Sequence, residues 1–402
     1  MLVGVADDGP KSVDVVRAKA KLDLMRLAGF DTLRLTTVWA PGQTQPAPVE
    51  LEGLRTAAAA ANIAGVRIVL SVYHAGSRTT PRTPLARRQF SRFAASLARE
   101  LPTVRHFVIG NEPNLNRFWM PQFTWLGRSR SPADYLALLA PTYDALKAVS
   151  RGITVVGGAL APRGADNPYA TRHTHSPGLF LRELGQAYRA SRRRKPIMDW
   201  LAFHPYGEHS SQPPEFRRHP RSKTIGLNDY GKLVKALRQA FDGTRQRGAT
   251  LPILYAEYGI EAAVPFERAD AYTGREHTTT RPVSELTQGN FYRRALALAR
   301  CQPTVKGFLL FLLTDEPALD RWQSGLLYPD DSPKTSFAAV RDAVTSVRAP
   351  GSPCGLPPPP LLPPPGIAVI PPVAVVPPVT LPVEPPPDEP VEPPARLGGL
   401  PE

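Results

Sequence analysis

Two short segments of this 402-residue chain place a glutamate at the end of an apolar run. The first spans residues 104–114 (VRHFVIGNEPN), where the apolar run ends in a glycine followed by Asn111 and Glu112. The second spans residues 254–259 (LYAEYG) and contains Glu257. Short β-branched runs bounded by Gly and Pro are typical of buried strands. The sequence therefore predicts one carboxyl group near the carboxyl end of each of two buried strands.

Two carboxyl groups facing each other across a pocket are the groups that cleavage of a glycosidic bond requires. One carboxylic acid protonates the leaving oxygen, and the other, as a carboxylate, meets the anomeric carbon. A separation of about 5–5.5 Å makes the second group a nucleophile and retains the configuration, whereas a wider gap admits water and inverts it. We expect Glu112 and Glu257 to form such a catalytic pair.

The elements that must position this pair alternate between strand and helix patterns. Strands are predicted at residues 2–6, 32–36, 67–72, 106–110, 154–158, 200–203, 253–256 and 308–312. Helices are predicted at residues 13–28, 51–64, 86–100, 132–149, 178–192, 229–246, 284–300 and 336–347. Eight strand–helix units are the number that closes a parallel barrel. We therefore predict an α/β fold, a (β/α)8 TIM barrel with long strand-to-helix loops.

The connections differ in length between the two ends of the predicted strands. Helix-to-strand connections are short near Gly29, Gly65 and Gly152, whereas the connections that follow the fourth to eighth strands are long. In a barrel those long loops share the face that carries active sites. An open doubly wound sheet is the alternative, and it is disfavoured because residues 6–10 contain no glycine-rich phosphate fingerprint.

Composition separates the end of the chain from the rest. We count 21 of the 47 prolines in residues 350–402, and such a segment cannot build a hydrogen-bonded core. We predict a catalytic domain over residues 1–348 and a Pro-rich disordered tail over residues 349–402. The tail is either an inert spacer or a segment that crosses a cell wall or docks a partner. Its five acids and one base give it a charge of −4, so the formal +14 of the chain leaves +18 on the preceding residues.

A domain this basic would suit nucleic acid, an anionic polymer or a cell surface. Solvated Arg-rich helix faces, such as residues 192–195, are the alternative that we favour. Aromatic and basic residues do not interleave as a single-strand-binding groove requires, and no run of about 18 apolar residues could span a membrane. We expect a carbohydrate substrate as the partner of a monomer, with no nucleic acid and no membrane span.

The two cysteines bear on the compartment. Cys301 ends the seventh predicted helix and Cys354 lies just beyond the eighth, and these helix ends are neighbours in a barrel. A disulfide between them is therefore reasonable, with two unrelated thiols as the alternative. A disulfide would place the protein outside the reducing cytosol. Together with the tail it favours a secreted or cell-envelope protein, although no signal peptide precedes the first predicted strand.

Further polar and aromatic residues fall at predicted strand ends on the same face as the glutamates. Arg34 and Trp39 belong to the second strand and its end, His74 follows the third, and His204 and Tyr206 follow the sixth. Burying polar groups without partners is costly, so a core strand normally avoids them. Their convergence on one face favours a functional site.

The Asn-Glu-Pro motif at residues 111–113, with a second glutamate on the seventh strand, resembles the clan of retaining β-glycosidases with (β/α)8 barrels. The chain is most similar to cellulase-like family 5 and to family 39 over about residues 1–345. The resemblance implies that Glu112 is the general acid/base and Glu257 is the nucleophile. It implies a retaining double displacement and no cofactor.

The same resemblance implies roles for the surrounding side chains. Asn111 would bind the sugar 2-hydroxyl, and Arg34 would keep the nucleophile ionised. His204 and Tyr206 match the pair on the sixth strand that lines the cleavage subsite, and Tyr206 would donate a hydrogen bond to the nucleophile. His74 is a looser match in the same substrate-binding set.

Aromatic faces stack on sugar rings, and four tryptophans in or before the long loops are candidate platforms. They are Trp39, Trp119, Trp125 and Trp322. Many relatives in the clan carry a Trp at the end of strand eight, where residues 311–316 here contain none. Either Trp322 folds back over the site, or the floor of the subsite is different.

We predict an O-glycosyl hydrolase that acts on a β-linked poly- or oligosaccharide. A catalytically inactive carbohydrate-binding barrel and a transglycosylase are the alternatives. His173 and His175 have no nearby Cys or carboxylate in the sequence, so we assign no metal.

Overall fold

The computed structural model describes residues 1–349 and residue 354, so nearly all of the predicted tail lies outside the described residues. The strands are β1 (Leu2–Ala6), β2 (Thr32–Trp39), β3 (Arg67–His74), β4 (His106–Ile109), β5 (Thr154–Leu160), β6 (Trp200–Phe203), β7 (Ile253–Tyr258) and β8 (Val305–Phe311). The α-helices are α1 (Val15–Leu27), α2 (Pro48–Ile63), α3 (Pro84–Glu100), α4 (Ser131–Val149), α5 (Pro177–Ala190), α6 (Tyr230–Phe241), α7 (Glu285–Arg300) and α8 (Ser336–Arg348). Three 3-10 helices are η1 (Ser77–Thr79), η2 (Leu227–Asp229) and η3 (Phe266–Ala271).

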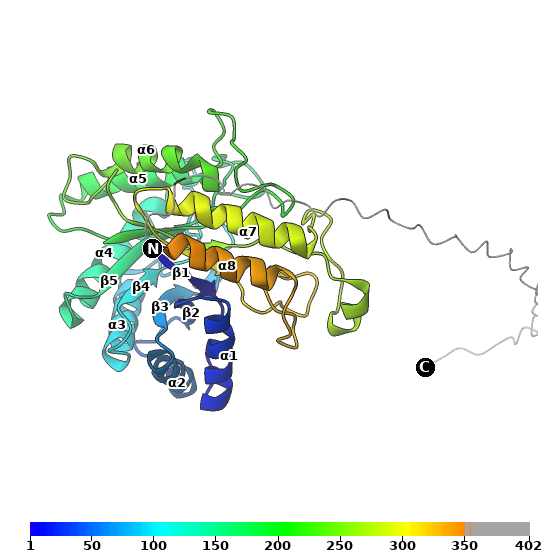
Figure 1. Cartoon of the computed structure of the whole chain (residues 1–402). Coiled ribbons are helices and arrows are strands. Elements are labelled where there is room, and N and C mark those ends of the chain that lie inside the picture. The colour runs from blue at the N-terminus through cyan, green and yellow to red at the C-terminus, as the bar shows by residue number, and fades with distance from the viewer. Residues whose placement is uncertain (350–353, 355–402) are drawn as a thin grey trace, which may run out of the picture. The chain divides into compact units, whose positions relative to one another are not determined.

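The eight strands form one closed barrel in which each strand pairs in parallel with its sequence neighbours and β8 pairs with β1. The helices surround the strands, and α7 and α8 lie side by side (Figure 1). The predicted TIM barrel is confirmed, and the alternative of an open doubly wound sheet is wrong. Every predicted strand and helix is present, and most ends differ by only a few residues because patterns define element interiors better than boundaries.

The local sequence explains where the helices begin. Proline occupies the first turn of α2, α3, α4 and α5, where its missing N–H has no intrahelical partner to lose. Asp14 caps α1 by accepting from two backbone N–H groups, and Ser176 and Ser284 cap α5 and α7 in the same manner with one each. These caps fix the points at which the strand-to-helix loops return to the barrel.

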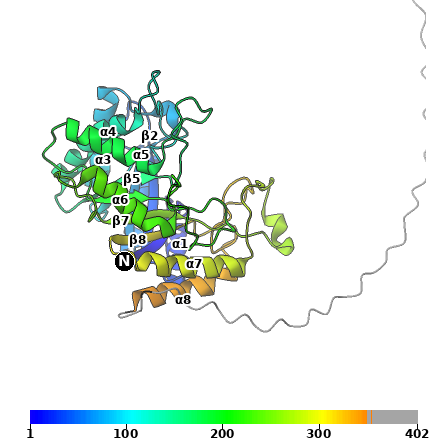
Figure 2. The same cartoon turned by 90° about the horizontal axis from the view of Figure 1, so that it is seen from above.

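Two apolar layers hold the barrel. The inner layer is a cluster of small and branched side chains from β3 to β8, namely Val69, Val108, Val156, Ala159, Ala202, Leu254, Ala256 and Leu309. Their strand neighbours, such as Leu70 and Phe107, belong to the larger core between the strands and the helices. Successive strand residues point to opposite faces, so one strand contributes to both layers. Figure 2 shows the helices packed around the strands from above.

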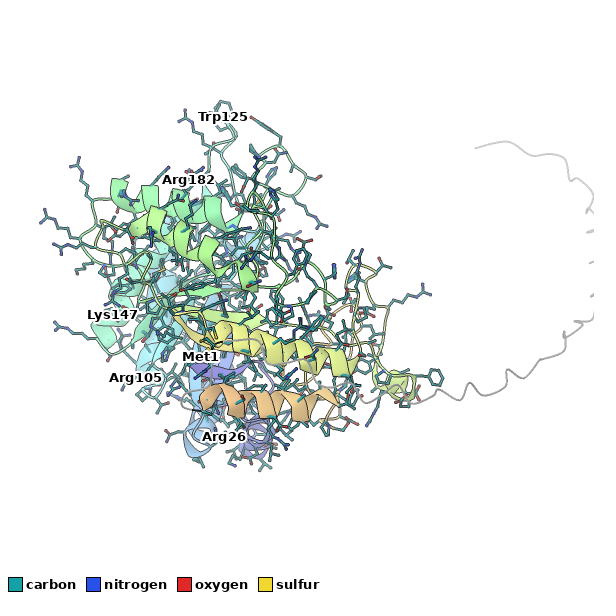
Figure 3. All side chains as sticks on the ribbon, turned by 45° about the horizontal axis from the view of Figure 1, so that its top comes forward. Met1, Arg26, Arg105, Trp125, Lys147 and Arg182 are labelled. Carbon is teal, nitrogen blue, oxygen red and sulfur yellow. The ribbon has the colours of Figure 1, made fainter. Side chains whose placement is uncertain are left out.

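The surface of the described chain is rich in basic side chains. Arg26, Arg105 and Arg182 are exposed; Arg182 lies far from Arg26, whereas Arg105 lies near Lys147 (Figure 3). Among the residues that the structure describes, no helix combines the length and the apolar character needed to cross a bilayer.

Candidate active site

The chain turns sharply after β4, and this turn places the first glutamate. Gly110 and Glu112 have φ angles of +87° and +41°, and a Cβ at position 110 would lie 3.1 Å from the Tyr135 ring. The backbone N–H of Glu112 donates to the Ala159 carbonyl at 2.8 Å, which ties the turn to β5. A left-handed conformation costs a non-glycine residue on the order of 1–3 kcal/mol, and such strain is concentrated at functional sites. The turn directs Glu112 into the main cleft of the barrel.

Glu257 is the fifth residue of β7, and its two carboxylate oxygens are bound by different groups. Oε1 forms an ion pair with the Arg34 guanidinium, and Oε2 accepts a hydrogen bond from the Tyr206 hydroxyl at 3.1 Å. Arg34 is only 2% exposed, and its Nε donates to the Ser71 hydroxyl at 2.6 Å. Glu257 is therefore oriented by side chains from β2 and from the loop after β6, and Arg34 is itself held by β3.

His204 follows β6 directly and joins the two glutamates. Its Nδ1 lies 3.0 Å from Glu112 Oε1 and 3.5 Å from Glu257 Oε2. Those two oxygens are consequently no more than about 6.5 Å apart, the sum of the two distances. This limit admits the separation of about 5–5.5 Å found in nucleophile–acid pairs, and it meets only the lower end of the inverting range of about 6.5–9.5 Å.

The electrostatic surroundings of Glu257 favour its ionised form. Burial by itself raises the pKa of Glu257, but attraction to His204 and Arg34 and hydrogen bonds from Arg34 and Tyr206 outweigh burial and leave the pKa below the usual value. Burial and the nearby carboxylates raise the pKa of Tyr206 well above its usual value, so its hydroxyl remains a donor. Glu257 thus has the environment of a carboxylate that attacks while ionised.

The two glutamates share a cleft of about 1070 Å³ with other predicted site residues. Asn111, Arg34, Tyr206 and Trp322 all line it. The Oδ1 of Asn111 is buried and has no hydrogen-bond partner among the described residues, so this amide is available to a ligand.

Trp322 folds back from the loop after β8 toward the barrel. Its ring centroid lies 5.1 Å from that of Phe311 at the end of β8 and 5.3 Å from that of Tyr206. The indole is half-buried and lines the cleft. Of the two arrangements left open by the sequence, the structure therefore has the one in which Trp322 covers the end of β8.

Apart from the fully buried His204, which contacts the two glutamates, three predicted substrate-binding side chains lie outside the cleft lining. Trp39 and Trp119 are 0% and 1% exposed, and both pack in the main core. His74 is also buried; its ring contacts Trp119 edge-on, and its Nδ1 bonds to the Gly76 carbonyl at 2.8 Å. These positions indicate packing roles for all three. Trp125 is 90% exposed at the outer part of its loop, away from the cleft lining (Figure 3).

Sequence reasoning missed Ser71 and Phe311. Ser71 orients Arg34, and the available signal was a hydroxyl in the middle of the apolar run of β3. Phe311 supports Trp322, and its position as the last residue of β8 was the signal.

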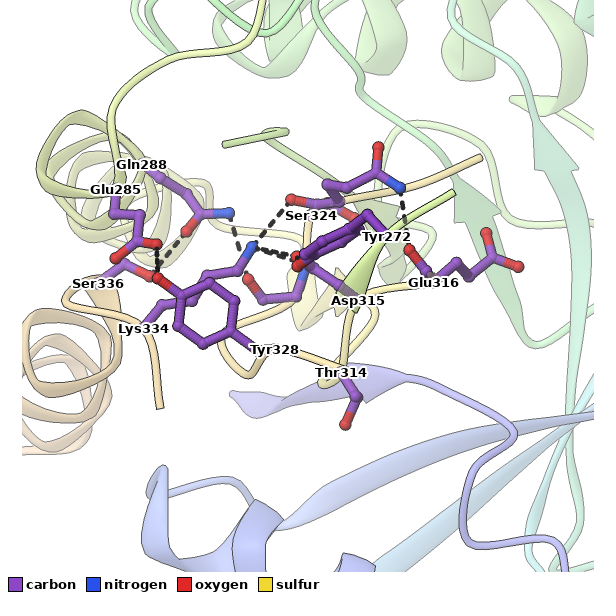
Figure 4. Close-up of polar contacts among 12 residues, drawn as sticks. Tyr272, Glu285, Gln288, Thr314, Asp315, Glu316, Ser324, Tyr328, Lys334 and Ser336 are labelled. Carbon is purple, nitrogen blue, oxygen red and sulfur yellow. Dashed lines mark hydrogen bonds and ion pairs between the residues drawn. The ribbon is translucent and has the colours of Figure 1, made fainter. Parts of the chain in front are cut away.

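A buried polar network holds the loop that carries Trp322 (Figure 4). The carboxylate of Asp315 pairs with the Lys334 ammonium at 2.7 Å and accepts from the Tyr272 hydroxyl at 2.6 Å. Lys334 also donates to the Gln323 carbonyl, next to Trp322. Burial raises the pKa of Asp315 and lowers that of Lys334, so each charge depends on the other. The network fixes the floor of the cleft at β8.

Neither histidine from the loop after β5 lies in a metal-binding cluster. His175 is buried and hydrogen-bonds to Ser129 and Gln122, and the described residues contain no cluster of three or more ligands that could hold a metal ion. Cys301 is half-buried at the end of α7 and Cys354 is exposed; their pairing stays a prediction.

No family model and no curated protein sequence matches the chain. Its fold, however, is shared with solved glycoside hydrolases. A GH5_18 enzyme from Streptomyces cattleya in complex with GlcNAc is 16% identical over 87% of this chain and 80% of that chain, with a TM-score of 0.57. A glucosidase from Croceicoccus marinus is 13% identical over 86% and 66%, with a TM-score of 0.55. A monomeric β-xylosidase from Caulobacter crescentus is 16% identical over 85% and 66%, with a TM-score of 0.53.

These structural matches show that the chain shares the barrel fold of enzymes that act on glycosidic bonds. The chain spans about two thirds of the length of the glucosidase and the xylosidase, and 34% of the length of a Bacteroides uniformis β-glucuronidase 2. The fold and the paired glutamates thus agree with the resemblance based on the Asn-Glu-Pro motif.

Proposed function

We propose that the chain is a glycoside hydrolase that cleaves β-linked poly- or oligosaccharides by a retaining double displacement. The observation that carries this proposal is the contact of one nitrogen, His204 Nδ1, with carboxylate oxygens of both Glu112 and Glu257. It supports a pair close enough for direct attack on a sugar carbon. The catalytic unit is residues 1–348, and no cofactor takes part.

In the first step an oxygen of Glu257 bonds to the anomeric carbon as the glycosidic C–O bond breaks. The carboxyl group of Glu112 gives its proton to the departing oxygen, so the leaving group departs neutral. Arg34 and Tyr206 hold Glu257 ionised and oriented before attack. The product of this step is an ester between the sugar and Glu257.

In the second step water hydrolyses the ester between the sugar and Glu257. Glu112, now a carboxylate, takes a proton from water, and the water oxygen bonds to the anomeric carbon. The bond to Glu257 breaks, and its carboxylate returns to the Arg34 ion pair. Two displacements at one carbon restore the original configuration.

The substrate class follows from the cleft and from the neighbours. The buried amide oxygen of Asn111 has no partner among the described residues, and Trp322 adds an aromatic ring to the cleft lining, so together they suit a sugar ring with hydroxyl edges. Solved neighbours are named a β-xylosidase, an exo-β-1,4-mannosidase and a β-glucuronidase, which supports a β-linked substrate.

A covalent trap tests the proposal. The full chain is incubated with a panel of 2-fluoro glycosides that carry activated leaving groups, and peptides are analysed by mass spectrometry. We expect one 2-fluoroglycosyl group on Glu257 in the wild type and none in Glu257→Gln. Glu208→Gln is the matched control, because Glu208 lines the same cleft without contacting the pair. A label on another residue would contradict the assignment, and no label together with no hydrolysis would favour the binding-only barrel.

Rescue with azide separates the two roles. We expect Glu257→Gly with azide to release the α-glycosyl azide, because azide replaces the nucleophile directly. We expect Glu112→Gly to release the β-glycosyl azide, because azide attacks the ester on Glu257. If the two variants instead released the opposite anomers, Glu112 would be the nucleophile and Glu257 the acid/base. Glycosyl transfer to added sugars in the wild type would indicate the transglycosylase alternative.

A further inference from the structure

Three arginines line the cleft and take no part in the steps proposed above. Arg117 lies in the loop after β4, and Arg163 and Arg172 lie in the loop after β5. None of the three forms an ion pair or a side-chain hydrogen bond with another described residue. By contrast, Arg193, in the connection after α5, pairs with Asp144 of α4 at 2.7 Å. The Arg117 guanidinium lies over the Phe118 ring, 5.5 Å from its centroid, and the N–H donors of all three guanidinium groups are available to an external ligand.

The loops after β4 and β5 are joined near two of these arginines, Arg117 and Arg172. Leu115 and Thr174 form an antiparallel bridge between the two loops. In an antiparallel pair, residue numbers rise along one segment while they fall along the other. Arg117 and Arg172 each lie two residues from the bridge, on the same side of it. The bridge thus places both on adjacent segments at the cleft.

Buried contacts hold the start of the loop after β5. Asn114 is fully buried; its amide donates to the carbonyls of Ala161 and His175 at 3.2 and 3.0 Å and accepts from the Ala161 N–H at 2.9 Å. A Cβ at Gly164 would approach the His175 backbone to 2.1 Å, so only glycine fits there. Arg163 lies between these two anchors, and its backbone position is therefore fixed.

The three arginines are on the side of the cleft that carries the proposed acid/base. Arg117 belongs to the same loop as Glu112, while Trp322 belongs to the loop after β8, four strands away around the closed barrel. The leaving group must reach Glu112 to receive its proton, so it extends toward the loops after β4 and β5. A leaving group that extends in this direction would contact these arginines.

We propose that this part of the substrate carries anionic groups, either the carboxylates of uronic acids or sulfate esters, which Arg117, Arg163 and Arg172 bind. The inference rests on the proposed function and names its substrate class as an acidic glycan. Guanidinium groups bind planar oxyanions through pairs of N–H donors. The net charge of residues 1–349 is +18, which is +14 less the −4 of the tail, and it attracts polyanions to the protein.

Binding without turnover tests the inference. Full-length Glu257→Gln is titrated with polygalacturonate (carboxylates only), dextran sulfate (sulfates only) and neutral dextran and glucomannan. We expect the protein to bind at least one of the two polyanions. Its affinity for the neutral polymers should be much weaker. Replacing Arg163 and Arg172 together by Ala should weaken that affinity at least about tenfold. Replacing both by Lys should weaken it less, because Lys keeps the positive charge but lacks the planar pair of N–H donors of a guanidinium group.

The matched control removes the same charge elsewhere. Arg192 and Arg245 line a separate basic groove at the ends of α5 and α6, and their double replacement by Ala should leave the affinity unchanged. An equal loss in both double variants would show attraction by net charge alone and overturn the inference, as would equal affinity for neutral polymers. Circular dichroism checks that each variant is folded. Since no cleavage is needed, these results are distinct from a failure of the covalent trap.

Discussion

The two sides of the cleft differ in whether their charged groups already have partners. The loops after β1 and β8 contribute carboxylates such as Asp7, which accepts from the N–H groups of Gly9 and Leu313, and Asp315, which pairs with Lys334. The loops after β4 and β5 contribute the three arginines, which form no ion pair or side-chain hydrogen bond with a described residue. The first set holds loops together, whereas the second set is left for a ligand. Polarity alone therefore does not identify a binding residue; an unused hydrogen-bonding group does.

Two residues near the loops after β1 and β8 are exceptions that sharpen this comparison. Arg17, at the start of α1, lines the cleft near the carboxylates but forms no ion pair with a described residue. Glu261 follows β7, is only 8% exposed, and forms no ion pair with a cation among the described residues. Burial and the neighbouring charge of Glu276 raise the pKa of Glu261 to about 7. It is the buried counterpart of the unpaired arginines.

The largest effect is expected where a cleft arginine does have a partner. Arg34→Met removes the charge that faces Glu257, so the pKa of Glu257 should rise and the acidic limb of the pH–rate profile should move to higher pH. An uncompensated buried carboxylate should also lower the free energy of unfolding by about 3–5 kcal/mol. We expect kcat/KM to fall at least about 100-fold, the lower end of the loss that follows removal of one preorganised electrostatic donor.

Arg34→Lys separates charge from geometry. It keeps a cation beside Glu257 and loses the donor to Ser71, so the acidic limb should move less than in Arg34→Met. An unchanged acidic limb in both variants would contradict the assignment of Glu257 as the group that must be ionised.

The partnered carboxylates should matter for stability before they matter for catalysis. Lys334→Met leaves Asp315 charged and buried without its cation, and urea denaturation should show a loss of about 3–5 kcal/mol. The double change Lys334→Met with Asp315→Leu should recover part of that loss, because it removes both buried charges. Arg55→Met is the control: it breaks an exposed pair with Glu100, and such pairs contribute only about 0–1 kcal/mol.

The unpaired carboxyl of Glu261 should make stability depend on pH. Its pKa of about 7 in the folded state lies above the usual 4.5, so its contribution is complete below pH 4.5 and is lost as pH rises through 7. Relative to Glu261→Gln, the wild type should lose about 3 kcal/mol of unfolding free energy across this interval. Glu208→Gln, which removes a half-exposed glutamate, should keep the wild-type dependence. Parallel curves for wild type and Glu261→Gln would mean that Glu261 has a partner in solution.

The fold was predictable because it depends on local patterns. Apolar runs, glycine and proline mark the strands and the starts of the helices, and the eightfold alternation leaves one closed topology. The same patterns place Glu112 and Glu257 at strand ends on one face. The roles of Arg34 and Tyr206 came from the resemblance, and the contacts agree with them.

The interiors of the long loops were not predictable, because contacts distant in sequence determine them. Nothing local indicates that Trp119 packs in the core, that Asp315 pairs with Lys334, or that the loops carrying Arg117 and Arg172 are bridged. The local sequence around a loop tryptophan does not show whether its side chain is buried in the core or exposed to solvent. Sequence therefore indicated which residues were chemically suitable, and tertiary packing decided which of them reach the cleft.

The smallest expected effect distinguishes an inward tryptophan from an outward one. Trp322→Ala removes an aromatic face from the cleft, and contacts of this kind contribute about 0.5–1.5 kcal/mol, so KM should rise roughly 2- to 12-fold with little change in stability. Trp125→Ala, at an exposed loop position outside the cleft lining, should change neither KM nor stability. If both variants raise KM equally, the glycan extends beyond the cleft to Trp125; if only Trp125→Ala does, the ring at β8 is not the sugar platform. An effect confined to Trp322→Ala would place the sugar ring on the side opposite the arginines and leave the loops after β4 and β5 to the leaving group.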